Sequence, residues 1–389
     1  MSLLQRLRPA ALAAPESGIV AVINHARGRD GLIPLWAGEG DLATPAFIAD
    51  AAARSLQEGE TFYTWQRGIP ELRQAIAGYT QRLYGRPTSP ERIFVTGSGM
   101  HAIQLVLTAL AGEGDEVVFV SPLWPNFAAA AGVSGAKPVE VPLDWTGSQW
   151  RLDLDRLRDA ITPRTRAVFV NTPNNPTGWT ADAQTIRDIL SITREAGVFV
   201  VADEIYSRFF YAGDRAPSFH DAMADGDALV FVNSFSKNWA MTGWRVGWIE
   251  APPELGQLIE NLVQYSNSGV ATFMQRGAVA AIEGGEAFIE TQVARAAEAR
   301  RIFTGALAAT NRVSIAPPDG AFYAFFAIDG ITDGMRAALS IADEVGVGLA
   351  PGAAFAPNTQ GHLRACFHRR LDQVEESAAR LVDWIGRQP

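Results

Sequence analysis

The chain has 389 residues, of which 48% are hydrophobic and 19% are charged. These fractions are those of a folded globular protein and exclude a disordered one, while the length favours two lobes over a single core. The net charge of −9, from 33 basic and 42 acidic residues, argues against nucleic acid or an anionic membrane as the partner.

The N-terminus contains no segment that we interpret as a signal peptide. Arg6 and Arg8 precede an Ala-rich stretch, but Pro15 and Glu16 interrupt that stretch. No apolar run approaches the ~20 residues that are needed to cross a bilayer. The single cysteine, Cys366, excludes an internal disulfide and fits a reducing compartment. We therefore expect a cytoplasmic protein that has no membrane partner.

From about residue 93 onward, short β-rich runs alternate with longer helical patterns. This alternation predicts a parallel sheet that is covered by helices. Several of the runs are continuously apolar, as in strands that are buried on both faces. The expected strands are residues 93–96, 116–120, 167–170, 198–202, 229–233 and 246–249.

The C-terminal part changes character and predicts a smaller α+β domain, which the N-terminal residues complete. We expect a large domain over residues 47–285 and a small domain built from residues 1–46 and 286–389. The expected elements of the small domain are a helix over 288–307, a Phe-rich segment over 321–327, a strand near 362–366 and a helix from Leu371.

Polar, Gly, Pro or aromatic residues directly follow five of the expected strands. In an open parallel sheet, ligands bind outside the carboxyl ends of the strands. Because five such ends converge on one edge of the sheet, we predict a ligand site there. The residues concerned are 97–100, 121–126, 171–178, 203–206 and 234–238.

One group of these residues suits a phosphate. Ser98 and the free N–H groups of Gly99 and Met100 would form an anion pocket at the N-terminus of a helix. Ser234 adds a hydroxyl, and Arg245 adds a planar cation that matches phosphate oxygens.

A second group suits a planar heterocycle. Trp124 offers a flat face for an aromatic ring. Asp203, at the end of a buried strand, needs a cationic partner, and a protonated pyridine nitrogen is such a partner. Asn175 and Tyr206 would donate hydrogen bonds to a phenolate oxygen.

The chain has 31 arginines but only two lysines, Lys137 and Lys237. Lys137 lies in a polar, Pro-flanked stretch, and we interpret it as solvated. Lys237 lies among the strand-end residues and would supply the amine for a Schiff base with an aldehyde. A phosphate, a planar ring, a ring nitrogen, a phenolate and an aldehyde together describe pyridoxal 5′-phosphate (PLP).

The run from Asn233 to Trp248, Asn-Ser-Phe-Ser-Lys-Asn-Trp-Ala-Met-Thr-Gly-Trp-Arg-Val-Gly-Trp, resembles the lysine motif of class I/II aminotransferases. These are the fold-type I PLP enzymes of the aspartate aminotransferase superfamily. Asn-Asn-Pro-Thr-Gly at 174–178, Asp-Glu-Ile-Tyr at 203–206 and the segment 63–73 are similar to its other signatures, in the same order. Only Met100 and His101 depart from the commoner residues of the phosphate loop.

The resemblance implies the fold and several roles. The fold would be α/β, with a mostly parallel seven-stranded sheet between helices in the large domain. Lys237, Asp203 and Tyr206 would be the catalytic residues. Arg364 would bind the substrate carboxylate, and Gly38, Asn175 and Trp124 would also contact the substrate. Tyr63 would reach the phosphate in a neighbouring subunit, which requires a homodimer with shared active sites.

The substrate is less clearly indicated than the cofactor. Aromatic residues near the predicted site favour a hydrophobic or aromatic L-amino acid as donor and a 2-oxo acid as acceptor. An aspartate-type donor would need a second cation, for which Arg67 is a candidate. The aromatic residues are Trp36, Trp65, Trp124, Phe127, Phe322 and Tyr323.

Two other functions remain as alternatives. A PLP lyase that catalyses β-elimination would use the same scaffold. A regulator that binds PLP without turnover is less favoured, because the family-like segment begins within the first ~40 residues and leaves no room for a DNA-binding domain. The five histidines show no metal-binding spacing, so we expect no metal site.

Overall fold

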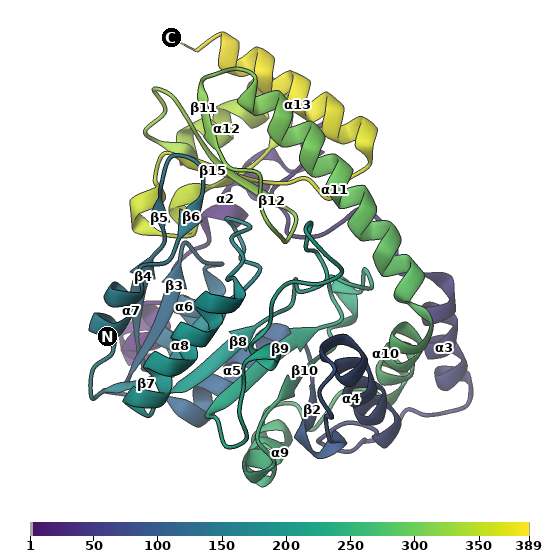
Figure 1. The fold of residues 1–389 in the computed structure, drawn as a ribbon. Coiled ribbons are helices and arrows are strands. Elements are labelled where there is room, and N and C mark those ends of the chain that lie inside the picture. The colour runs from purple at the N-terminus through teal and green to yellow at the C-terminus, as the bar shows by residue number, and fades with distance from the viewer. Residues whose placement is uncertain (1–2, 389) are drawn as a thin grey trace.

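The computed structural model describes residues 3–388, which form two lobes around two main sheets (Figure 1). The larger sheet has seven strands, and only β10 runs antiparallel to its neighbours. Its strand order is β2 (Ile93–Thr96), β10 (Gly247–Glu250), β9 (Leu229–Ser234), β8 (Phe199–Asp203), β7 (Thr165–Asn171), β3 (Glu116–Ser121) and β4 (Lys137–Pro142).

Alternate residues of the central strands face opposite helical layers. Val117 and Phe119 of β3 pack in the same apolar cluster as α5, α6 and α9, whereas Val118 and Val120 pack with α7 and α8. Burial on both faces accounts for the continuous apolar runs of these strands. The covering helices are α5 (Gly99–Leu110), α6 (Asn126–Ser134), α9 (Gly256–Ser266), α7 (Leu154–Ala160) and α8 (Ala183–Ala196).

Three further helices pack beside β2 and β10. Ile48, Ile76 and Ala278 of these helices share one apolar cluster with Val95 and Trp248 of the sheet. The helices are α3 (Ala46–Gln57), α4 (Pro70–Tyr84) and α10 (Thr272–Gly284).

The smaller lobe is built around an antiparallel four-stranded sheet. Val22 and Leu35 from the N-terminal part lie in the same core as Phe303 and Trp384 from the C-terminal part. The strands are β11 (Val313–Ile315), β12 (Tyr323–Ile328), β15 (His362–Cys366) and β14 (Ala350–Pro351). The helices are α2 (Gly18–Ala26), α11 (Glu286–Ala308), α12 (Gly334–Glu344) and α13 (Leu371–Gly386), whereas α1 (Pro9–Leu12) lies against α6 of the larger lobe.

Two minor sheets and one long helix complete the described fold. The minor sheets pair β1 (Ile33–Pro34) with β13 (Val347–Gly348), and β5 (Asp144–Trp145) with β6 (Trp150–Arg151). Helix α11 runs from the neighbourhood of α10 up along the smaller lobe to α13 (Figure 1). In the part of the chain that the structure describes, no helix is long and apolar enough to span a membrane.

The predicted fold class is confirmed, and all six expected strands lie within two residues of their predicted ends. One expected strand is antiparallel, because the turn before β10 ends at Arg245 in the left-handed conformation, with φ 55°, and reverses the chain. Strand β4 is not among the expected strands. It lies at the sheet edge and contains Pro138 and Pro142, which an edge strand tolerates. The domain boundaries stay a prediction.

Candidate active site

A cavity of about 350 Å³ lies between the carboxyl edge of the larger sheet and the four-stranded sheet. Eleven of the residues that the sequence places in the site line this one cavity. They are Gly38, Gly99, Met100, Trp124, Asn175, Asp203, Tyr206, Ser234, Lys237, Arg245 and Arg364.

Lys237 lies in the turn that follows β9. Its Nζ donates a hydrogen bond to the carbonyl oxygen of Gly38 at 2.6 Å and lies 5.9 Å from the centre of the Tyr206 ring. Burial lowers the pKa of Lys237 to about 8. Far more of this amine is therefore neutral near physiological pH than of an exposed lysine, and the neutral form is what a nucleophile or a general base requires.

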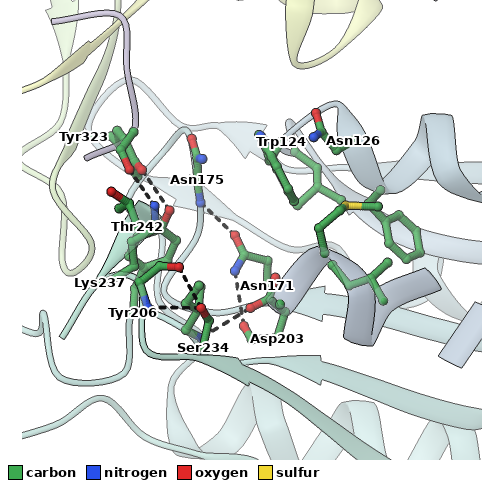
Figure 2. A pocket seen from close by; sticks show the side chains of 18 of the residues that line it. Trp124, Asn126, Asn171, Asn175, Asp203, Tyr206, Ser234, Lys237, Thr242 and Tyr323 are labelled. Atoms are coloured by element: carbon green, nitrogen blue, oxygen red, sulfur yellow. Dashed lines mark hydrogen bonds between the residues drawn. The ribbon is translucent and has the colours of Figure 1, made fainter. Parts of the chain in front are cut away.

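Asp203 ends β8 and is buried at the bottom of the cavity. Its Oδ1 accepts the N–H of Ile205 at 3.3 Å. Asn171 donates its Nδ2 to the backbone oxygen of Asp203 at 3.2 Å and accepts the N–H of Asn175 at 2.8 Å, so it lies between the two (Figure 2). Burial raises the pKa of Asp203 to about 7, although the Ile205 N–H and Lys237 oppose this effect. A cationic contact would keep this carboxylate ionised.

Arg364 and Tyr323 line the side of the cavity that lies opposite the larger sheet. The phenol oxygens of Tyr206 and Tyr323 lie 2.7 Å apart, although the residues are 117 positions apart in sequence (Figure 2). Arg364 is 2% exposed and donates to Asn175 Oδ1 at 3.2 Å and to the backbone oxygen of Trp36. Its Nε is buried without a hydrogen-bond partner among the described residues. A guanidinium in this state fits a carboxylate that enters the cavity.

The start of α5 forms the anion-binding end of the cavity. Ser98 caps the helix, because its Oγ accepts the N–H of His101 at 3.0 Å. The backbone packs tightly here, since a Cβ on Gly247 would lie 2.7 Å from the nitrogen of Gly99. The first N–H groups of a helix have no partner within the helix, so they are free to bind an anion.

Ser234 and Arg245 lie beside this helix start. Ser234 Oγ donates to Ser236 Oγ at 2.8 Å, and Arg245 Nη1 donates to the backbone oxygen of Thr242 at 2.5 Å. Ser98, Arg245 and Ala240 are three of the six non-glycine residues with positive φ in the described chain. Such backbone conformations cost about 1–3 kcal/mol each and concentrate at functional sites.

The donor set of this cavity fits PLP. The start of α5 and Arg245 suit a phosphate, while the buried carboxylate of Asp203 suits a protonated ring nitrogen. The amine of Lys237, with its lowered pKa, suits an aldehyde. Arg364 is left for the carboxylate of a substrate.

Several residues singled out in the sequence lie elsewhere. Ser98 caps α5 at the anion-binding end but is not among the residues that line the cavity, and Tyr63 does not line it either and is 95% exposed. Trp65 is also exposed, and Phe322 packs in the core of the smaller lobe. Arg67 pairs with Glu260 and Glu91 outside the cavity, with its Nε 2.7 Å from the Glu260 carboxylate. Arg67 therefore cannot bind a second substrate carboxylate in the cavity of its own chain.

Some residues in and beside the cavity had no individual role assigned to them from the sequence. Asn171 ends a strand, and that position was a usable signal for its role beside Asp203. Ile19 and Val20 carry no comparable signal, because they reach the cavity from other parts of the chain, whereas Tyr323 was named from the sequence as an aromatic residue near the site and does line the cavity. Cys366 is buried on β15 near Lys237, and burial raises the pKa of its thiol.

Comparisons with known proteins agree with this geometry. A family model described as aminotransferase class I and II matches residues 30–381. A probable aspartate aminotransferase from Methanocaldococcus jannaschii is 32% identical over 351 residues, which cover 89% of this chain and 91% of that protein. The aromatic-amino-acid aminotransferase 2 of Thermococcus litoralis is 31% identical, with 94% of each chain covered.

Solved structures give the same result. An alanine aminotransferase from Pyrococcus furiosus superposes with a TM-score of 0.92 at 29% identity, covering 98% of this chain and 100% of that one. An aspartate aminotransferase from Thermotoga maritima gives a TM-score of 0.91 at 28% identity, with the same coverage. The chain therefore belongs to the class I and II aminotransferases, and it is a PLP-dependent enzyme that transfers amino groups.

Proposed function

We propose that the amino donor is a hydrophobic or aromatic L-amino acid and the acceptor is a 2-oxo acid. The distribution of charge in the cavity carries this proposal. Within the described residues, the cationic side chains that line the cavity are Lys237, Arg245 and Arg364. Lys237 is assigned to the cofactor aldehyde, Arg245 to its phosphate and Arg364 to the α-carboxylate of the substrate. This leaves no cation of this chain for a carboxylate at the far end of a donor.

The rest of the lining supports an apolar donor. We call Ile19, Val20, Met100, Trp124 and Phe127 the apolar wall, because these five residues line the cavity with apolar or aromatic surface. We call Asp203, Ser234, Lys237 and Arg245 the polar floor. Pockets that bind hydrophobic ligands combine such an apolar lining with a few polar groups that orient the ligand.

We propose the following contacts with the cofactor. Lys237 binds it covalently as a Schiff base, and Asp203 pairs with its ring nitrogen. Asn175 and Tyr206 donate to its phenolate oxygen, and Trp124 covers its ring. The phosphate is bound by Ser98, the N–H groups of Gly99 and Met100, Ser234 and Arg245.

When bound, PLP supplies a ring that accepts the electron pair released by the Cα–H bond of the substrate. Arg364 binds the α-carboxylate through two parallel hydrogen bonds and so orients that bond. Lys237 would hold the aldehyde of the cofactor and, as a free amine, would be the base that moves the proton of the substrate Cα. Asp203 keeps the ring nitrogen protonated throughout. The carbonyl of Gly38 accepts from Lys237 Nζ at 2.6 Å, and Gly38 would also contact the substrate.

We propose that the enzyme is a homodimer in which Tyr63 reaches the active site of the partner copy. Phe62, Tyr63 and Tyr265 are 86%, 95% and 85% exposed, which is unusual for aromatic side chains that have no partner surface. Measuring the molar mass in solution tests the dimer. Tyr63→Phe would weaken PLP binding if its hydroxyl reaches the phosphate.

We place the enzyme in the cytoplasm, because its one cysteine, Cys366, is a free thiol and is buried. Immunolocalisation or cell fractionation tests this assignment. Recovery in an extracytoplasmic fraction would contradict it.

Steady-state kinetics with a panel of amino donors tests the proposed substrate class. With 2-oxoglutarate or pyruvate as acceptor, we expect kcat/KM for phenylalanine and leucine to exceed the value for aspartate. A preference for aspartate would overturn the proposal and would favour the aspartate-type function that many relatives carry in their names. Pyruvate formed from a donor without any 2-oxo acceptor would indicate β-elimination instead.

A further inference from the structure

A buried amide links the two lobes beside the active site. Gln292 lies on α11, the long helix that passes from one lobe to the other (Figure 1), and is 1% exposed. Its Nε2 donates to the backbone oxygen of Asn238 at 2.8 Å, and its Oε1 lies 3.2 Å from Nε2 of His368. Asn238 directly follows Lys237, and His368 lies four residues after Arg364.

His368 is held in one orientation by its surroundings. The residue is 1% exposed, and its ring lies 5.3 Å from the ring of Phe209 and 5.1 Å from that of Phe322. Burial lowers the pKa of His368 to about 3, so the imidazole is neutral. Because Gln292 Oε1 is an acceptor only, Nε2 of His368 carries the proton and donates it. Nδ1 is left without a partner among the described residues.

The same helix is tied to the segment that accepts from Lys237. Arg295, one turn after Gln292, forms an ion pair with Asp41, whose other carboxylate oxygen accepts the N–H of Arg370 at 2.6 Å. The segment that ends at Asp41 also contains Gly38, the acceptor for Lys237 Nζ. Helix α11, residues 38–41 and the stretch after β15 are therefore connected around the lysine.

We propose that Gln292 is a positioning residue that holds the backbone next to Lys237 in register with the strand that carries Arg364. The proposal rests on the roles proposed above for Lys237 and Arg364. A buried amide that loses either partner leaves an unsatisfied polar group, so both hydrogen bonds resist separation. Gln292 thereby couples the place where the substrate carboxylate binds to the place where its proton is moved.

Gln275 provides a matched control for this proposal. It is 0% exposed on α10 and also makes two hydrogen bonds, in this case both with the backbone, from Ile69 N–H to its Oε1 at 2.8 Å and from its Nε2 to Val270 oxygen at 2.6 Å. Neither of its partners adjoins Lys237 or β15. Gln275→Met and Gln292→Met therefore remove the same kind of buried interaction at different places.

The experiment compares these two variants as PLP-loaded enzymes. Hydrogen–deuterium exchange reports on the backbone of residues 234–241, and titration of the cofactor absorbance gives the Kd of 3-phenylpropionate, which has no amino group to transfer. We expect Gln292→Met to exchange about tenfold faster in this segment and to bind the acid about five- to tenfold more weakly. We expect Gln275→Met to lose similar thermal stability but to leave both readouts unchanged.

A second pair of variants tests the histidine side of the link. His368→Phe keeps the ring packing but loses the donor, so it should weaken binding of the acid to a similar extent. The double variant His368→Phe with Gln292→Met should be no weaker than Gln292→Met alone, because both changes break one link.

The outcomes are decisive in each direction. The positioning role would be overturned if residues 234–241 of Gln292→Met exchanged at the wild-type rate. It would also be overturned if Gln275→Met changed exchange and acid binding as much as Gln292→Met does. If the wild-type enzyme itself fails to bind 3-phenylpropionate, the proposed donor class fails, while the exchange measurement still decides the role of Gln292.

Discussion

The polar floor and the apolar wall of one cavity are built in different ways. The floor residues Asp203 and Ser234 end neighbouring strands of the larger sheet and are buried. In the wall, Val20 comes from helix α2 near the N-terminus and is 48% exposed, while Met100 comes from α5. The floor therefore depends on the ends of the sheet strands, whereas the wall also draws on helices that lie outside the sheet. We infer that the floor determines the reaction and the wall selects the donor.

Removing the amine of the floor should give the largest effect. Lys237→Ala should lower turnover by about four orders of magnitude or more, because both the covalent attachment and the general base are lost. It should also abolish the borohydride-reducible absorbance of the bound cofactor. Lys137→Ala is the control, since the exposed Lys137 lies outside the cavity. Full activity in Lys237→Ala would end the assignment.

Removing the charge of Asp203, the carboxylate of the polar floor, should give the second largest effect. Asp203→Asn should lower kcat by about 10²–10³-fold, because the developing charge on the ring loses its electrostatic partner. Glu204→Gln is a matched control: the neighbouring carboxyl is also buried and its pKa is also raised to about 7, but it accepts a hydrogen bond from Ser218 outside the cavity. Equal losses of kcat in the two variants would show that burial, and not contact with the cofactor, accounts for the effect.

Arg364 belongs to the four-stranded sheet and faces the polar floor across the cavity. Arg364→Gln should raise KM about a hundredfold for every amino donor, since truncating a buried charged partner costs about 2–5 kcal/mol. The donor preference should stay as in the wild type. Arg369→Gln serves as control, because Arg369 donates to Pro34 oxygen at 2.9 Å and does not line the cavity. An unchanged KM in Arg364→Gln would refute the carboxylate role.

The difference between floor and wall also explains what the sequence predicts. Asp203, Lys237 and Asn175 each follow a recognisable strand, so residue type and position together indicate one edge of the sheet. The strand His362–Cys366 and the start of the last helix at Leu371 agree with the sequence expectation to the residue. Such local patterns depend on nearby residues alone.

Only part of the wall could be predicted in this way, because Met100 and Trp124 follow strands whereas Ile19 and Val20 do not. Ile19 and Val20 reach the cavity only because the smaller lobe folds against the larger one, and no local pattern records that packing. The aromatic residues Trp65 and Phe322 show the converse, since their type suggested the site but their contacts place them outside it. Side chains that meet across lobes are set by tertiary packing, which a single sequence does not display.

The lowered pKa of Lys237 should make the rate of PLP binding depend on pH, and this effect is smaller than those of the substitutions above. Only the neutral amine attacks an aldehyde, and burial lowers its pKa to about 8. The rate at which the apoprotein binds PLP should therefore rise about tenfold from pH 7 to pH 9 and then level off. Stopped-flow absorbance measures this rate, with Lys137→Met as control. A rate that keeps rising beyond pH 10 would mean that the amine is not desolvated.

The wall should give the smallest change in rate but the clearest change in preference. Val20→Arg adds a cation to the lining without touching any floor residue, so a donor with a second carboxylate gains a partner. Because a partly exposed ion pair contributes up to about 1 kcal/mol, kcat/KM for aspartate relative to phenylalanine should rise about fivefold. Val133→Arg is the control, since Val133 is 40% exposed on α6 but lies outside this cavity. The rise should shrink at high salt, because the added charge is near solvent. An unchanged ratio of kcat/KM for aspartate and phenylalanine in Val20→Arg would mean that residues outside the apolar wall select the donor. The assignment of the polar floor would still stand if Lys237→Ala is inactive.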